Sequence, residues 1–305
     1  MRPVPALLIM VTGLWAGGPA TGGYPGAFAR VGYDARSMAL AGALLADINS
    51  GFLALTNPAS TVHVQKRELG LSYLSLPLDR NLQSLSLAFR LPPTAAAGIS
   101  YLRAGDDNIQ GRNSIGEGTG RLAYAEQMAI LTFANRLGSA FSMGLNFKLL
   151  WIDLEEEGAK GFGIDFGLLY HTPGGFNLAL SIQNITGAYA WKVSTSEGEN
   201  IYDEQFPRII SIGIRAPWRH FTFFGQTDVV IPAQESAITV TRLAIEDRVG
   251  ERYFLRLGLE HTTLTMGVGL RYAVRQPLDS GVDYSLSMGK NGEGLGHIFT
   301  WRFNL

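Results

Sequence analysis

The sequence predicts an all-β fold: a 14-stranded antiparallel transmembrane β-barrel with an N-terminal segment inside it. Three observations predict this fold: apolar and polar residues alternate from about residue 66 onward, the alternating segments are even in number, and their connections differ in length on the two sides. Composition agrees, because only 17% of the 305 residues are charged whereas 46% are hydrophobic. Soluble domains usually carry about 25% charged residues.

The N-terminus has the pattern of a secretory signal peptide. Arg2 precedes an apolar run, Ala6 to Ala16, and small residues follow up to Ala20. This order predicts a cleaved signal over residues 1–20. A buried first strand or helix is the alternative, but the run is too short to span a bilayer as a helix.

Residues 21–65 differ from the rest of the chain. They are rich in Ala, Gly and Leu and do not alternate, and Ser37 to Ala46 suits a short helix. We expect this segment to form a hatch inside a barrel made by residues 66–305.

Strand-length segments fill the remainder of the chain. In Phe162 to Tyr170, for example, the even-numbered residues are apolar and the odd-numbered ones are mostly polar or glycine. Most segments approach the roughly 9 to 11 residues that a tilted strand needs to cross a bilayer. The predicted strands are 66–76, 82–90, 94–104, 123–135, 139–152, 161–171, 175–184, 207–216, 219–231, 238–247, 251–260, 263–273, 280–289 and 295–304.

The connections between these strands favour a location in the outer membrane of a diderm bacterium. The even-numbered connections are short turns, whereas the two long ones, Gly105 to Gly120 and Ile185 to Gln205, fall on the other side. Aromatic residues near both strand ends predict two girdles at the lipid headgroups. A soluble β-sandwich is the alternative, but its polar face would carry many Lys and Glu residues.

The predicted inward face mixes both charge signs, which favours an ion-paired wall over a selective ion channel. Four late arginines form a possible basic cluster in the lumen: Arg242, Arg252, Arg256 and Arg271. This cluster suits an anionic group or acidic residues of the hatch, for which Asp34 and Asp47 are the candidates.

The sequence gives no sign of enzymatic chemistry or of a cofactor. It contains no G-x-S-x-G or H-E-x-x-H motif and no cysteine. Residues 106–117 approach a calcium-loop pattern, but Gln110 departs from it and the flanks read as strands, so a solvated loop is preferred. The net charge of −1 argues against a nucleic-acid partner.

The N-terminal stretch Gly32 to Thr61 resembles the signature of the PorV/PorQ family, within the wider FadL-like outer-membrane barrels. The similarity lies in Gly32 to Ala43, Asp47, the Asn57-Pro58-Ala59 motif and the stretch Val282 to Leu286. The resemblance implies fourteen strands and a hatch. Asn57, Pro58 and Ala59 would form a fixed turn where the hatch meets the first strand.

The resemblance leaves two functions of different classes. The main interpretation is a non-enzymatic partner in type IX protein secretion, which contacts secretion-system proteins or exported cargo. The alternative is a FadL-like uptake channel for a hydrophobic ligand. The long connection Gly105 to Gly120 is polar, whereas Ala188 to Trp191, Met128 and Ile130 offer apolar surface for such a ligand.

The last residues, FTWRFNL, predict the closing strand. Phe299, Trp301, Phe303 and Leu305 would face the outer-membrane lipid while the strand pairs with the first one, since an unpaired edge is not tolerated in hydrocarbon. The same residues resemble the signal read by the barrel assembly machinery, with Leu305 where a terminal Phe is usual.

Overall fold

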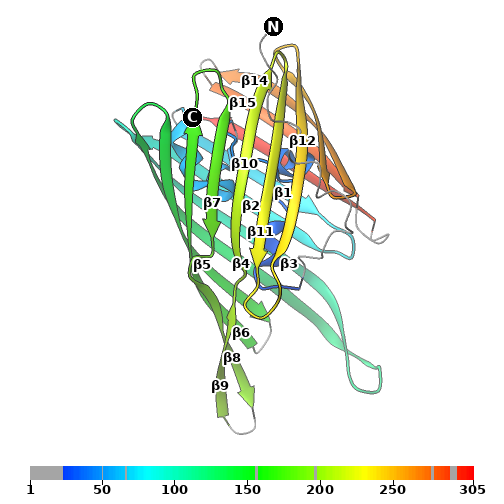
Figure 1. The fold of residues 1–305 in the computed structure, drawn as a ribbon. Coiled ribbons are helices and arrows are strands. Elements are labelled where there is room, and N and C mark those ends of the chain that lie inside the picture. The colour runs from blue at the N-terminus through cyan, green and yellow to red at the C-terminus, as the bar shows by residue number, and fades with distance from the viewer. Residues whose placement is uncertain are drawn as a thin grey trace.

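The computed structural model describes residues 23–49, 51–65, 67–154, 157–195, 198–275, 278–288 and 294–305. Within these ranges, fourteen antiparallel strands form a closed barrel, as the sequence predicts (Figure 1). The predicted signal peptide lies outside the described residues. The strands of the ring are β1 (Arg67–Ser75), β2 (Asn81–Leu91), β3 (Ala95–Arg112), β4 (Gly118–Leu137), β5 (Phe141–Leu154), β6 (Glu157–His171), β7 (Asn177–Gln183), β10 (Arg208–Trp218), β11 (Phe221–Ile231), β12 (Ile238–Val249), β13 (Tyr253–Glu260), β14 (Thr263–Arg275), β15 (Leu278–Met288) and β16 (Leu295–Asn304).

The ring closes between its first and last strands. β16 pairs with β1 in antiparallel register, with Trp301 opposite Leu71 and Phe303 opposite Leu69. The N–H of Leu305 adds a final hydrogen bond of 2.8 Å to the carbonyl oxygen of Arg67. No strand of the ring is therefore left with an open edge in the part of the chain described here.

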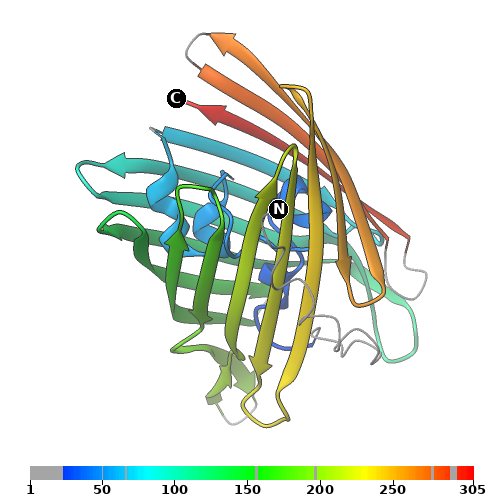
Figure 2. The same ribbon diagram turned by 45° about the horizontal axis from the view of Figure 1, so that its top comes forward.

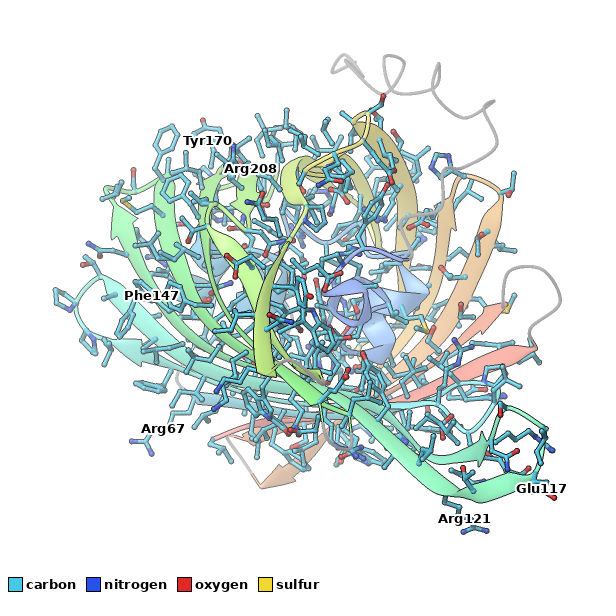
Figure 3. All side chains as sticks on the ribbon, turned by 90° about the horizontal axis from the view of Figure 1, so that it is seen from below. Arg67, Glu117, Arg121, Phe147, Tyr170 and Arg208 are labelled. Carbon is cyan, nitrogen blue, oxygen red and sulfur yellow. The ribbon has the colours of Figure 1, made fainter. Side chains whose placement is uncertain are left out.

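The two faces of the wall have opposite polarity. Along β5, Leu145 and Leu149 are exposed on the outside, while Asn146 and Lys148 between them are buried in the lumen. Figure 3 shows Phe147 and Tyr170 on the outside of the ring. Such an apolar outer band on a closed barrel is what lipid contact requires, and it places the protein in the outer membrane. No helix in the described ranges is long and apolar enough to cross a membrane.

The two long connections contain more β-structure than predicted. β3 and β4 continue as a hairpin whose tip is only residues 113–117, and the second connection forms another hairpin from β8 (Gly187–Thr195) and β9 (Gly198–Gln205). Both project past the same end of the barrel (Figure 1). The predicted strand ends are wrong here because hairpins in water keep their backbone pairing without an apolar face. A register shift between Asp106 and Ile109 marks the point where the β3–β4 pair passes from the barrel wall into the projecting hairpin.

The N-terminal segment, residues 23–49 and 51–65, lies inside the ring, as Figure 2 shows for its short helices. These are η2 (Ala27–Arg30), α1 (Ala35–Ala39), α2 (Leu53–Thr56) and η3 (Pro58–His63). α1 contacts β13 to β16, and η3 contacts β2 to β6 on the opposite side. The helix expected over Ser37 to Ala46 is shorter because the left-handed residues Ala41 (φ 50°) and Gly42 (φ 76°) end it.

We expect the double variant Trp301→Ser/Phe303→Ser to lose barrel assembly. Both side chains lie on the outer face of β16, and each replacement exchanges a large apolar contact with lipid for a hydroxyl, at about 1.5–3 kcal/mol per residue. The measurement is the heat-dependent gel mobility of outer-membrane fractions. Thr300→Ser, which keeps an inward hydroxyl, is the matched control. Normal amounts of folded double variant would contradict the role given to these residues.

Candidate functional site

The lumen wall is apolar toward the end of the barrel that carries the two hairpins. Inward-facing side chains of neighbouring strands are at most 5% exposed there and pack with the aromatic residues of β8 and the stretch before β10. We call this set the outer apolar cluster: Leu102, Met128, Ile130, Leu150, Ile152, Tyr189 and Phe206. The sequence pointed to Met128, Ile130 and the stretch Ala188 to Trp191, which contains Tyr189, but it missed Phe206, which lies outside the ring of strands.

The N-terminal segment fills the space in front of this cluster. Phe28, Phe52 and Leu55 are buried against it. Phe52 approaches the wall so closely that a Cβ on Gly70 of β1 would lie 2.6 Å from its ring. Glycine is therefore required at position 70 to let the segment fit against β1.

One carboxylate lies within the apolar surroundings. Glu126 of β4 is 7% exposed, and it accepts hydrogen bonds from the hydroxyls of Tyr189 (2.8 Å) and Tyr124 (3.1 Å). The backbone N–H of Gly26 also approaches Glu126 and stabilises its charged form. Glu126 thus attaches the start of the N-terminal segment to the outer apolar cluster.

Below this level, a layer of ion pairs joins the N-terminal segment to the wall. Arg36 of α1 lies 2.5 Å from Asp47 and 2.7 Å from Glu246 of β12. Glu246 also pairs with Arg256 at 2.7 Å, and Arg256 reaches Asp283 at 2.6 Å. All five are buried, so each charge depends on its partners for stabilisation.

The predicted basic cluster is distributed among wall carboxylates. Arg242 pairs with Asp228 and Glu260, and Arg271 pairs with Asp283, as Arg256 does. The expected pairing with the acidic residues of the segment is therefore replaced by cross-strand pairing. The register explains this, since Arg242 lies directly opposite Glu260, and Arg256 opposite Glu246.

The two acidic residues proposed as partners have other roles. Asp34 caps α1 through the backbone N–H of Ser37 at 2.5 Å, and Asp47 pairs with Arg36 and lies 3.3 Å from Arg215. The fourth arginine, Arg252, is exposed in the turn between β12 and β13.

Arg252 borders a cavity of about 780 Å³ at the turn end of the barrel. Arg215, Arg271 and Arg302 also line it, together with Glu68. The lumen therefore changes along its axis from apolar, through a layer of ion pairs, to a wide polar vestibule.

The Asn57-Pro58-Ala59 motif packs against β5 and β6 rather than at the start of β1. The Asn57 side chain accepts a hydrogen bond from the N–H of Ala59 (3.0 Å) and donates to the carbonyl oxygens of Leu45 (3.1 Å) and Leu168 (3.2 Å). Pro58 starts η3. The motif was expected at the first strand, but the segment turns back across the lumen before reaching it.

Replacing Glu246 should loosen the attachment of the N-terminal segment. Glu246→Gln leaves Arg36 and Arg256 without their shared carboxylate, and removing one member of a buried ion pair costs about 3–5 kcal/mol. We expect a lower urea midpoint and faster proteolysis within residues 23–65. Glu251→Gln in the adjacent turn is the control. An unchanged midpoint for Glu246→Gln would show that this ion pair does not hold the segment.

His63 of η3 should make stability depend on pH. Burial, with His171 and Arg136 nearby, lowers the pKa of His63 from 6.5 to about 4. The unfolded chain takes up this proton first, so the contribution is fully present above pH 6.5 and is lost as the pH falls to about 4. The urea midpoint of the native protein should fall more between pH 7.5 and 5 than that of His63→Gln. His220→Gln, at an exposed turn, should keep the native slope; an equal slope in His63→Gln would contradict this assignment.

No protein-family profile and no curated protein matches this chain. Solved structures do match. The Pseudomonas putida toluene transporter TodX superimposes with a TM-score of 0.62 at 14% identity, covering 89% of this chain and 96% of that one. The CymD monoaromatic hydrocarbon channel gives 0.60 at 14% identity (90% and 97%), and a Pseudomonas aeruginosa FadL homologue gives 0.59 at 10% identity (89% and 97%).

These similarities correct the main functional expectation. The fold is that of hydrocarbon channels and a FadL homologue, so the prediction of a partner in type IX secretion is wrong. The sequence motif that suggested it describes how the N-terminal segment packs, which does not distinguish secretion from transport. The chain has the barrel fold of the FadL-like outer-membrane proteins.

Proposed function

We propose that the protein is a FadL-like channel that takes up hydrophobic small molecules from outside the cell. The observation that carries this proposal is the outer apolar cluster. Water-filled porin lumens are lined by polar residues, whereas Leu102, Met128, Ile130 and Leu150 give this lumen an apolar wall. PorV/PorQ membership stays a prediction that rests on the sequence motif alone.

An incoming solute would take the place of Phe28. This ring belongs to the outermost part of the N-terminal segment, where Gly26 binds Glu126 and the Tyr24 hydroxyl donates to Glu235. The deeper part of the segment is held by the ion pairs of Arg36. The outer part is therefore the easier one to displace, and an apolar solute would recover the apolar contacts that Phe28 leaves.

The layer of ion pairs limits the route by which a solute could leave the lumen. A hydrophobic molecule moving straight along the axis would have to separate Arg36 from Asp47 and Glu246, which are buried and mutually stabilising. Exit through the barrel wall into the membrane would avoid that cost. In this proposal the N-terminal segment serves as the hatch that closes the axial route.

Polar substitution in the outer apolar cluster should weaken solute binding. We expect Met128→Gln/Ile130→Thr to weaken the binding of labelled toluene by about tenfold or more, since each lost buried CH₂ contact costs about 0.8 kcal/mol. Equilibrium dialysis of protein in lipid nanodiscs, with empty nanodiscs subtracted, measures the effect.

The matched control is Met128→Leu/Ile130→Leu, which keeps the apolar surface and should keep binding. Heat-dependent gel mobility confirms that each variant forms a barrel. Equal toluene binding by the polar and apolar double variants would contradict the location of the site, and no binding by the native protein would refute the proposed function.

A further inference from the structure

We propose that Glu126 makes the channel selective for neutral hydrophobic solutes, with preference for those that carry a hydroxyl, and against organic anions. The inference rests on the proposed function and names its substrate class. Glu126 is a charged side chain that binds Tyr189 of the outer apolar cluster and lies beside Gly26 at the displaceable end of the N-terminal segment.

The geometry around Glu126 leaves one position to be filled by a solute. Its two oxygens accept hydrogen bonds from the hydroxyls of Tyr189 and Tyr124, and the backbone N–H of Gly26 also approaches it. Both tyrosines are fixed to the barrel and its hairpin, whereas Gly26 precedes η2 and leaves with Phe28. A solute in that space meets a buried carboxylate that has lost one hydrogen-bond donor.

The chemical group that the solute places beside Glu126 then decides how favourable its binding is. A hydroxyl can donate to Glu126 in place of Gly26, which restores a charge-assisted hydrogen bond. A hydrocarbon has no donor to replace the N–H of Gly26. Glu126 then keeps its two tyrosine donors but is not compensated for the loss of that N–H. A carboxylate places a second negative charge beside the first in a region of low dielectric, where like charges repel strongly.

Neighbouring charges reinforce this discrimination. Glu204 of β9 lies near enough to act electrostatically on both Tyr124 and Tyr189. Arg30 offsets Glu126, but it belongs to η2 and its guanidinium is bonded to the carbonyl oxygens of Tyr24 and Pro25 within the displaceable stretch. Lys148, on the wall below, is engaged by Asp165 at 2.6 Å.

The test compares two solutes of equal chain length, 1-octanol and octanoate, by equilibrium dialysis in zwitterionic nanodiscs at pH 7.5. The native protein should bind octanol at least about tenfold more tightly than octanoate. Glu126→Gln should bring octanoate within about threefold of octanol, because the amide carries no charge and still accepts a hydrogen bond. Glu117→Gln, which removes one charge at the exposed tip of the β3–β4 hairpin, should behave as the native protein does.

The outcomes separate the two proposals. Strong octanol binding with equally strong octanoate binding by the native protein would overturn the selectivity and leave the uptake function standing. An unchanged octanol-to-octanoate ratio in Glu126→Gln would overturn the role of this residue. Absence of binding by either solute and by toluene would refute the proposed function itself.

Discussion

The structure depends on one constraint: every backbone N–H and C=O group within the hydrocarbon must find a partner in the protein. Strands meet this requirement only when the sheet has no free edge, so β16 must return to β1, and the pairing of Leu71 with Trp301 sets the stagger at which the ring closes. The outward apolar and inward polar alternation follows from the same closure, because each strand then has one face toward lipid and one toward the lumen.

Closure creates an interior that must itself be filled. The N-terminal segment does so with surfaces that match the wall level by level. Phe28, Phe52 and Leu55 meet the outer apolar cluster, whereas Arg36 and Asp47 meet the charged wall. Buried charges make the deeper contact specific to one arrangement, since shifting the segment along the axis would separate Arg36 from Glu246 of the wall.

The division of the lumen into levels relates structure to transport. An apolar solute is stabilised by contact with the outer apolar cluster and meets a barrier at the layer of ion pairs. The N-terminal segment can therefore be displaced at its outer end while its deeper part stays bound. Glu126 lies beside the displaceable end of the segment, among apolar neighbours that strengthen the electrostatic interactions of its carboxylate. Selectivity and opening would thus depend on the same few contacts.

The sequence by itself determined the strands of the barrel wall and which of their faces points to lipid. Alternation, strand length and turn position are local properties, and they were sufficient for the count of fourteen strands, the lipid face of β16 and the inward position of Met128 and Ile130. Only the tertiary structure determined which residues contact one another inside the barrel. The ion pair of Arg36 with Glu246, the packing of Asn57 on β6 and the approach of Gly26 to Glu126 join residues far apart in the chain. Their proximity depends on strand register and on the path of the N-terminal segment across the lumen, which no local pattern encodes, because many pairings satisfy the same alternation.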